Sequence, residues 1–589
     1  MMLRFIFSLF VAFSAVTLQA SPNVVIVITD DQGYPDIGAH GNPIIKTPHL
    51  DQLWGESVRL EDYHVAPTCS PTRAGFLTGR WTNRTGVWHT IMGRSMLREN
   101  EVTLAQHLKE GGYATGMFGK WHLGDNYPFR PEDRGFEEVL RHGGGGVGQT
   151  PDYWDNAYFD GSYFHNGVAV PVKGFCTDVY FEYAKAFIKT QKEAGKPFFA
   201  YITTNAPHGP MHAPERYQKL YPELSEKDQS YYGMISNIDD NVGALRAYLE
   251  GEELAENTIF IFTTDNGSVG TKLYDANMRG GKGSEYDGGH RVPFFCYWPA
   301  GELEQRVVTQ LSGHVDVVPT ILDLCGVDSA PHSPRVDGVS LRPLLEGRAK
   351  SWPDRILVTD SQRVKDPIKW RKSSTMRGPW RLINGEQLYH VKNDPKQAKD
   401  VASDHPEVVQ ELRDFYDAWW ADLEPSFSIP AKIILGNDAE NPSRLTSHDW
   451  ITVGSTPWNQ GHVRSGLDKE GTQGFWYVQV ERGGEYEVEL RRWPREAKQP
   501  IDQGLPAGEP VPGQQAFRET PGRAISDIEK ASVEIGETKV VVDVPAGSEF
   551  VRMSLQIPAG DYKLWAKFHR NDGSEMGAYY AYVRRNGKK

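Results

Sequence analysis

Three short apolar segments constrain the fold of this chain more than any other feature of its sequence. They span residues 24–28, 198–202 and 258–263, are rich in β-branched and aromatic residues, and show no alternation with polar residues. Strands of this kind belong in the centre of a sheet that is covered on both faces. Helix-like stretches separate them, so the sequence predicts an α/β fold with a central, mostly parallel sheet over residues 21–350.

Each segment is followed directly by polar residues that can bind ligands. Asp30 and Asp31 follow the first segment, residues 203–205 the second, and Asp265 and Asn266 the third. Ligands of open α/β sheets bind at the carboxyl ends of the strands. A single Asp pair at a strand end is more often a turn or a helix cap, but three carboxylates and an amide together suit a hard divalent cation. We therefore predict a site for Ca²⁺, or for Mg²⁺, made by these four side chains.

A cysteine motif lies between these clusters. Cys69-Ser-Pro-Thr-Arg73 places a possible nucleophile and a guanidinium four residues apart, and Ala-Gly-Phe-Leu-Thr-Gly-Arg80 follows. A lone cysteine is usually a small buried hydrophobic residue. The surrounding motif is far rarer than the cysteine itself, and it favours a catalytic role.

Three further motifs carry cations or imidazoles. Lys120 and His122 lie two apart in Gly119-Lys-Trp-His-Leu-Gly and can point to the same side of an extended segment. His208 lies between two prolines in Ala-Pro-His-Gly-Pro, which suits a catalytic donor or a structural turn. Lys282 belongs to a glycine-rich stretch over residues 280–293, whose glycines allow close approach to an anion.

Together these motifs closely resemble the signatures of the formylglycine-dependent sulfatases, a branch of the alkaline phosphatase superfamily. The resemblance implies an alkaline-phosphatase-like α/β sandwich. It also implies that a formylglycine-generating enzyme oxidises Cys69 to an aldehyde, which acts as the nucleophile and touches the cation. The implied roles of the other residues are orientation of position 69 by Arg73, sulfate binding by Lys120 and Lys282, base catalysis by His122, and general-acid catalysis by His208 with Lys282. The one departure from the motif is Thr72, where Ser is commoner.

A glycine run, Gly143–Gly146, invites a phosphate-loop interpretation. It lacks the Gly-Lys-Ser/Thr ending and a preceding strand. We interpret it as an active-site loop that lines the substrate pocket together with His142, Asp152 and Trp154.

Residues 351–425 change to short strands followed by a helix, an order that resembles the small C-terminal subdomain of sulfatases. Within that helix, residues 406–420, one apolar stripe is predicted, with the members Val408, Leu412, Phe415 and Trp419. Residues 426–589 contain alternating strands and many Pro and Gly residues. They predict an additional all-β domain of the sandwich or jelly-roll type. Its aromatic residues fit carbohydrate binding or, more simply, core packing; those singled out are Trp450, Trp458 and Trp476.

The N-terminal segment of the chain indicates an exported protein. Met1–Ala20 has the Arg4 n-region, apolar core and small-residue end of a signal peptide, with a short membrane anchor as the alternative. No later segment reaches transmembrane length. The formal charge of −13 argues against a nucleic-acid partner. Of the four cysteines, Cys296 and Cys325 lie in apolar runs that predict buried thiols.

The sequence therefore predicts a periplasmic or secreted sulfatase that acts on a sulfated polysaccharide or its oligosaccharides. Two alternatives stay open. One is a phosphodiester or phosphonate monoester hydrolase of the same superfamily, which would share the cysteine motif and the cation site. The other is a carbohydrate-binding protein with an inactive sulfatase-like domain.

Overall fold

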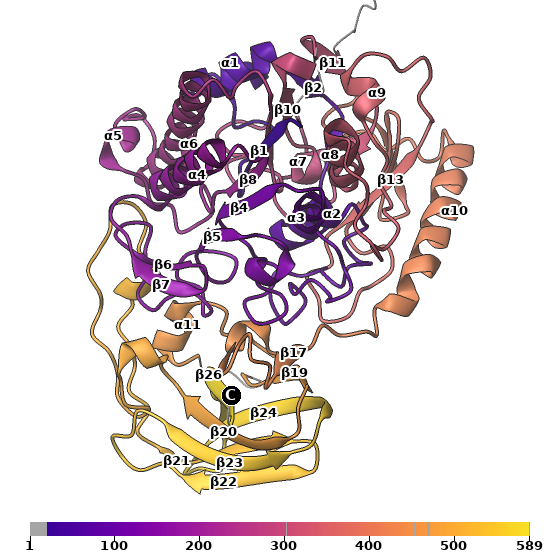
Figure 1. Ribbon diagram of the computed structural model, residues 1–589. Helices are drawn as coiled ribbons and strands as arrows, with labels where there is room; N and C mark the ends of the chain where they lie inside the picture. Colours follow the sequence, from indigo (N-terminus) through magenta and orange to yellow (C-terminus); the bar gives the residue numbers. More distant parts are fainter. Residues whose placement is uncertain (1–20, 302, 453, 468–471, 588–589) are drawn as a thin grey trace, which may run out of the picture.

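The computed structural model describes residues 21–301, 303–452, 454–467 and 472–587, so the predicted signal peptide lies outside the described residues. The larger part of the chain is built on a ten-stranded sheet in the order β11-β2-β10-β9-β1-β8-β4-β5-β6-β7 (Figure 1). Its strands are β1 (Asn23–Thr29), β2 (Val58–Leu60), β4 (Ala114–Gly119), β5 (Glu138–Arg141), β6 (Ser162–His165), β7 (Val168–Pro171), β8 (Phe198–Thr203), β9 (Thr258–Thr264), β10 (Phe294–Tyr297) and β11 (Arg306–Val308).

The centre of this sheet is parallel, as the sequence predicts. Strand β1 lies between β8 and β9 and is parallel to both, and β4 and β5 continue the parallel order beyond β8. Strands β6, β7 and β10 run antiparallel to their neighbours. The register places Ile28 beside Thr203 and Thr29 beside Thr264. The carboxyl ends of the neighbouring strands β1, β8 and β9 therefore lie at one edge.

Helices cover both faces of the sheet. Val24, Ile26 and Ile28 of β1 pack into one apolar core, and the alternate residues Val25 and Val27 pack into another. The first core includes residues of α2, α3 and α8, and the second includes residues of α1, α4 and α6. Burial on both faces explains why β1 has no polar alternation. The helices of this part are α1 (Pro48–Glu56), α2 (Cys69–Thr78), α3 (Leu104–Glu110), α4 (Cys176–Ala194), α5 (Glu215–Gln218), α6 (Glu226–Gly251), α7 (Asp287–His290), α8 (Val317–Cys325) and α9 (Arg342–Leu345).

A smaller antiparallel sheet follows. Its order is β13-β14-β15-β16, and α10 (Pro406–Leu423) packs against it. The predicted apolar stripe of α10 is only half right: Leu412 and Trp419 are buried, whereas Val408 and Phe415 are partly exposed. The helix buries Val409 and Tyr416 in their place. The strands are β13 (Ile356–Asp360), β14 (Ser373–Arg377), β15 (Trp380–Ile383) and β16 (Gln387–His390).

The C-terminal part, which we call the β domain, holds two sheets that enclose one apolar core, drawn in orange and yellow in Figure 1. Trp450 and Trp476 are fully buried in this core, so the carbohydrate-binding interpretation is wrong for both and core packing is confirmed. The sheets and helix comprise β17 (Ile433–Leu435), β19 (Phe475–Val480), β21 (Ile528–Ile535), β22 (Thr538–Asp543), β24 (Gly560–Arg570) and β25 (Glu575–Gly577); β18 (Ser443–Thr446), β20 (Gly484–Arg491), β23 (Val551–Ile557) and β26 (Tyr580–Arg585); and α11 (Gln460–Ser465).

All four cysteines are free and buried, which confirms the prediction of buried thiols for Cys296 and Cys325. Among the described residues, the helices are all too short or too polar to cross a lipid bilayer.

Candidate active site

The ends of four neighbouring parallel strands supply most of the predicted site. Asp30 and Asp31 follow β1, Asp265 follows β9, and Lys120 follows β4. The Lys120 backbone N–H donates to the Thr203 carbonyl oxygen at the end of β8, at 2.7 Å. Asp30, Asp31 and Asp265 therefore follow neighbouring strands, as the sequence predicts, and Lys120 lies at the same edge because adjacent parallel strands end together.

Cys69 enters from outside the sheet as the first residue of α2. Its motif forms a helix because Pro71 occupies the first turn, where no N–H is needed, and Gly79 ends it with a left-handed φ of 69°. Cys69 is only 2% exposed. Burial raises the pKa of its thiol, an effect that the nearby charges of Lys120 and Lys282 oppose.

Three ion pairs connect the predicted cations to the predicted metal ligands. Lys120 Nζ lies 2.6 Å from Asp30 Oδ2, and Lys282 Nζ lies 2.5 Å from Asp31 Oδ1. Arg73 pairs with Asp265 at 2.8 Å. The positive and negative charges of these pairs are equal in number, which offsets the cost of burying them together.

The oxygen atoms of this cluster fit a divalent cation. Three potential ligand atoms lie within 4.8 Å of one another: one carboxylate oxygen of Asp30, one of Asp265, and the sulfur of Cys69. Asp30 Oδ1 and Asn266 Oδ1 are buried without a hydrogen-bond partner among the described residues. Burial, and then the charge of Asp30, raise the pKa of Asp265 to about 6, so the cluster can accommodate more positive charge. Buried carboxylate and amide oxygens that lack donors are suitable ligands for Ca²⁺ or Mg²⁺.

The two predicted histidines differ in their tautomers. His122 Nε2 lies 2.8 Å from the Thr90 carbonyl oxygen and must donate to it, whereas His122 Nδ1 is buried with no described partner. His208 Nδ1 lies 2.7 Å from the Gly209 carbonyl oxygen, and its Nε2 faces Asp31 Oδ2 at 3.9 Å. Burial and then Lys120 lower the pKa of His122; burial and then Lys282 lower that of His208 to about 3. Both imidazoles are therefore neutral, each with one unprotonated nitrogen.

A cavity of about 110 Å³ brings Cys69, His122, His208 and Lys282 together. Sequence reasoning missed several residues that line the same cavity: Thr90, Ile91, Gln149 and Arg363. Trp458 also lines it, although the sequence placed this residue only among possible carbohydrate-binding aromatics. The four missed residues come from three separate loops and share no sequence motif, so nothing in the sequence marks them as part of one site. Trp458 was singled out only because it is aromatic.

The glycine run follows β5, which ends at Arg141, so the expectation that no strand precedes it is wrong. The run does reach the site, but its predicted companions do not line the cavity. Gly145 lies against the His122 ring. Asp152 instead stabilises the conformation of the loop, because its carboxylate accepts hydrogen bonds from the Gly143 and Gly148 N–H groups at 3.1 and 2.8 Å. The other two predicted companions are buried elsewhere: His142 bonds the Gly143 carbonyl oxygen, and Trp154 packs against Trp493 of the β domain.

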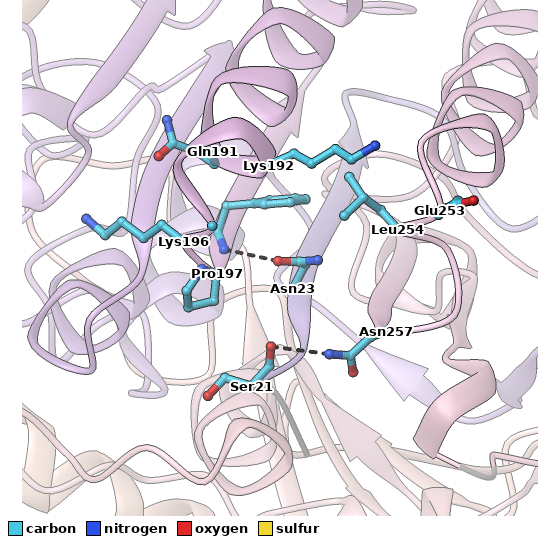
Figure 2. Close-up of a pocket in the computed structure, with 11 residues that line it drawn as sticks. Ser21, Asn23, Gln191, Lys192, Lys196, Pro197, Glu253, Leu254 and Asn257 are labelled. Carbon is cyan, nitrogen blue, oxygen red and sulfur yellow. Dashed lines mark hydrogen bonds between the residues drawn. The ribbon is translucent and has the colours of Figure 1, made fainter. Parts of the chain in front are cut away.

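A larger cavity, of about 310 Å³, lies at the amino ends of β1 and β8, away from these groups (Figure 2). Its lining includes Asn23, whose Oδ1 accepts from the Phe198 N–H at 3.3 Å, and the helix-end residues Lys192 and Gly195. The amino ends of parallel strands are not the usual ligand edge.

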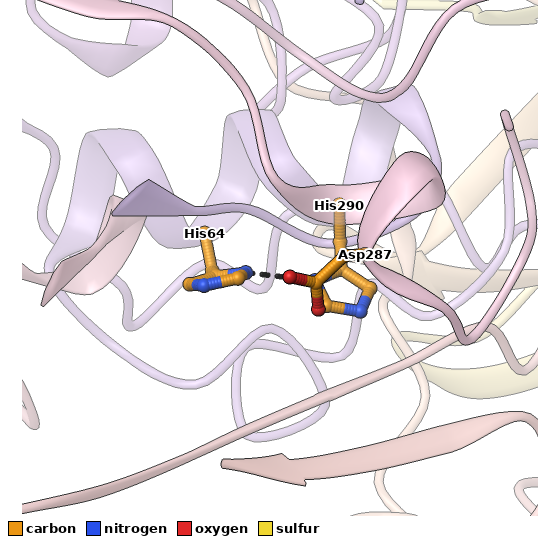
Figure 3. Close-up of side chains that lie close together, drawn as sticks. All are labelled: His64, Asp287 and His290. Carbon is orange, nitrogen blue, oxygen red and sulfur yellow. Dashed lines mark hydrogen bonds between the residues drawn. The ribbon is translucent and has the colours of Figure 1, made fainter. Parts of the chain in front are cut away.

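A second group of potential metal ligands joins Asp287 and His290, in the stretch that follows Lys282, to His64, which precedes the cysteine motif (Figure 3). The two imidazoles are hydrogen-bonded through their Nδ1 atoms at 2.8 Å. Asp287 is paired with the buried guanidinium of Arg381 at 3.0 Å. Unlike Asp30 Oδ1 and Asn266 Oδ1, no nitrogen or oxygen of these three side chains is buried without a hydrogen-bond partner among the described residues. This group therefore anchors the polypeptide after Lys282 and does not favour a cation.

Comparison with known proteins agrees with this geometry. A family model described as Sulfatase matches residues 22–327. The N-acetylgalactosamine-6-sulfatase of Canis lupus familiaris is 33% identical over 358 residues, covering 55% of this chain and 66% of the relative, just under two thirds of its length. Arylsulfatase J of Mus musculus is 32% identical over 463 residues, covering 67% of this chain and 75% of the relative.

A solved structure also matches. The crystal structure of Ps i-CgsB in complex with k-i-k-neocarrahexaose has a TM-score of 0.62 and 26% identity, covering 68% of this chain and 92% of that one. The chain belongs to the sulfatase family of the alkaline phosphatase superfamily, which places it among the sulfuric ester hydrolases.

Proposed function

We propose that this protein is an exported sulfatase that hydrolyses sulfate monoesters on a sulfated polysaccharide or its oligosaccharides. One observation supports this most directly. Cys69 stands at the start of a helix in a cavity that also contains Lys282, His122 and His208, next to the carboxylates of Asp30 and Asp265. A lysine and a helix N-terminus at one point favour an anion there.

Two groups are required beyond the residues described. Formylglycine at position 69 would supply, as its hydrate, an oxygen nucleophile and a second hydroxyl for releasing sulfate. A divalent cation, with Ca²⁺ favoured and Mg²⁺ possible, would lower the pKa of that nucleophile and neutralise charge. Its holders would be Asp30, Asp31, Asp265, Asn266 and position 69.

The remaining work falls to charged side chains of the chain itself. Arg73 is fully buried and fixed by Asp265 and by the Lys120 carbonyl oxygen, so it orients the groups around position 69. Lys120 and Lys282 bind the sulfate oxygens and stabilise the charge that grows on them in the transition state.

The histidine tautomers assign the proton transfers. His122 Nδ1 has a free lone pair, so it can take the proton from the second hydroxyl when sulfate leaves. His208 is neutral before substrate binds and has no proton on Nε2. Lys282 carries one, because burial is outweighed by Asp31, which raises the Lys282 pKa. Lys282 therefore supplies the proton for the leaving oxygen, and His208 assists the transfer. The negative charge of the bound sulfate raises the His208 pKa, which makes protonation of His208 Nε2 easier.

Support for a carbohydrate substrate comes from the relatives. One is named an N-acetylgalactosamine-6-sulfatase, and one similar structure contains a neocarrahexaose. The apolar segment within residues 1–20 supports export to the periplasm or medium. Export would bring the enzyme to polymers that cannot enter a cell.

Sulfate release from a panel of sulfated mono- and oligosaccharides tests the proposal, with Cys69→Ala as the control. Mass spectrometry of natively produced protein tests for formylglycine at position 69. Activity that survives Cys69→Ala, or active protein with an unmodified thiol, would contradict it. Chelation followed by addition of Ca²⁺ or Mg²⁺ should abolish and then restore activity.

The alternative activity is phosphonate or phosphodiester hydrolysis. The same panel should therefore include a phosphonate monoester, and a clear preference for it would replace sulfate as the substrate class. The other alternative is a carbohydrate-binding protein with an inactive sulfatase-like domain. It would be supported if protein that contains formylglycine hydrolysed none of the sulfate esters in the panel.

A further inference from the structure

The β domain is bonded directly to the loop that carries the glycine run. Gln149 and Asn459 form an antiparallel bridge. On either side of it, the Thr150 N–H donates to the Trp458 carbonyl oxygen at 3.0 Å, and the Gln460 N–H donates to the Gly148 carbonyl oxygen at 3.0 Å. This short ladder fixes the backbone of Trp458 against the wall of the active-site cavity.

Two further loops of the site make similar bonds to the β domain. The segment after His208 pairs with Gln514, whose Oε1 accepts from the Met211 N–H at 2.9 Å and whose N–H donates to the Met211 carbonyl oxygen at 2.9 Å. The His448 carbonyl oxygen accepts from the Met92 N–H at 2.9 Å. The β domain is therefore a structural part of the active site and not an independent appendage.

Trp458 is the aromatic residue that this docking brings to the cavity. It is half-buried and lines the cavity with Gln149 and His208, in contrast to the core residues Trp450 and Trp476. It also makes a T-shaped contact with Phe517 at 6.1 Å between ring centroids, which restricts its movement. A tryptophan held at the mouth of a polar cavity offers a flat apolar surface to a sugar ring.

Arg363 reaches the same cavity from the smaller subdomain, between β13 and β14. Its backbone is left-handed, with a φ of 40°, and its N–H donates to the Trp88 carbonyl oxygen at 3.1 Å. Non-glycine residues in this conformation cluster at functional sites. Lys282 is paired with Asp31, whereas the exposed guanidinium of Arg363 has no ion pair or hydrogen bond recorded within the described part of the chain.

The cavity is too small to enclose a saccharide, since pockets that do so usually exceed about 300 Å³. Building on the proposed sulfatase function, we infer that Trp458 and Arg363 determine specificity at its mouth. Trp458 stacks on the ring that bears the sulfate ester, and Arg363 binds a second anionic group, a sulfate or a uronic carboxylate, on the same saccharide. The preferred substrate is therefore a saccharide with at least two anionic groups.

Binding is measured by titration calorimetry in a Cys69→Ala background, which gives a readout without turnover. The probes are 6-sulfates of galactose, glucosamine and N-acetylgalactosamine, each paired with a derivative that has a second sulfate or an attached uronic acid. We expect the second anion to tighten binding of at least one pair about tenfold or more. Arg363→Gln should remove that preference, and Lys369→Gln, in the same loop, should retain it.

Trp458→Ala should weaken binding of both members of the pair about three- to tenfold. Its control is Trp565→Ala, a half-buried tryptophan of β24. Absence of any preference for the second anion, or a preference that survives Arg363→Gln, would overturn the role of Arg363. Unchanged binding by Trp458→Ala would overturn the role of Trp458. Sulfate release by the unmutated protein is measured in a separate assay. Absence of release there would contradict the sulfatase proposal, whereas the binding data test only the roles of Trp458 and Arg363.

Discussion

Arg73 holds Asp265 by two hydrogen bonds to a single carboxylate oxygen: Nε and Nη2 both donate to Oδ2, at 2.9 and 2.8 Å. The other oxygen, Oδ1, accepts from the Asp31 N–H at 3.3 Å. Both side chains are fully buried. One carboxylate therefore fixes the guanidinium beneath position 69 and the backbone between the two β1 carboxylates.

Replacement of Asp265 by Asn should lower the free energy of unfolding by about 3–5 kcal/mol, because Arg73 would remain buried without a charged partner. The control is Asp337→Asn, which removes the partly exposed partner of Arg84 and should cost about 1 kcal/mol or less. Denaturant unfolding in the presence of chelator separates this effect from loss of a cation. Equal destabilisation by both variants would contradict the assignment.

Gly145→Ala should reduce kcat about 10- to 100-fold, because the new Cβ would lie 2.1 Å from His122 Cε1 and displace the imidazole. The adjacent Gly146→Ala is a matched control, since its nearest neighbour is the Gln149 amide nitrogen at 3.3 Å, which is the end of a flexible side chain. Steady-state kinetics with thermal unfolding of both variants measures the contrast. A Gly145→Ala enzyme as active as Gly146→Ala would show that His122 need not hold its position.

His122→Ala and His208→Ala should fail at different steps. Loss of the His122 base should leave the sulfated enzyme intermediate intact, so that intact-protein mass spectrometry detects one added sulfo group and turnover falls about 10²- to 10⁴-fold. Loss of His208 should slow formation of that intermediate, so none accumulates. Accumulation in His208→Ala alone would exchange the two roles.

Glu489 in the β domain should make the free energy of unfolding depend on pH in the acidic range. Its buried carboxylate accepts hydrogen bonds from Arg495 and Arg491, which outweigh burial and lower its pKa to about 2. A lowered folded pKa means that this stabilisation is present above about pH 4.5 and is lost as the pH falls through 2. Glu489→Gln should destabilise the protein by roughly 1.5–3 kcal/mol at pH 7 and by less at about pH 2.5.

Urea unfolding at pH 7, 4.5 and 2.5 measures this dependence. The control is Glu487→Gln on the same strand, whose carboxylate is 22% exposed and pairs with Arg584. It should change stability by less than about 1 kcal/mol at each pH. A pH-independent effect of Glu489→Gln would exclude the ionised carboxylate as its cause.

The sequence predicted the strand ends well because their signal is local. A fully buried strand needs a continuous apolar run, and β1, β8 and β9 begin and end within one residue of the predicted segments. The polar residues that follow then fall at one edge by the geometry of parallel pairing. The cysteine, lysine and histidine motifs could be placed because each is read from a few adjacent residues.

The rest depended on contacts between distant parts of the chain. Trp458 has the same side chain as Trp450 and Trp476, and only docking of the β domain separates the cavity residue from the two core residues. Arg363 has no neighbouring residue that marks it as part of a site. On α10, Val409 and Tyr416 replaced the predicted Val408 and Phe415, because the position of the small sheet selects which face of an apolar helix is buried.

The burial of Cys69 also sets an order of events. In the folded chain its side chain is 2% exposed, and burial raises the pKa of the thiol, so the sulfur is protonated and out of reach of another protein's catalytic groups. Any enzyme that converts this cysteine must therefore act on the growing or extended polypeptide. If conversion of position 69 is required for activity, as proposed, a molecule that folds first stays unconverted, and the active fraction of a preparation depends on the relative rates of conversion and folding.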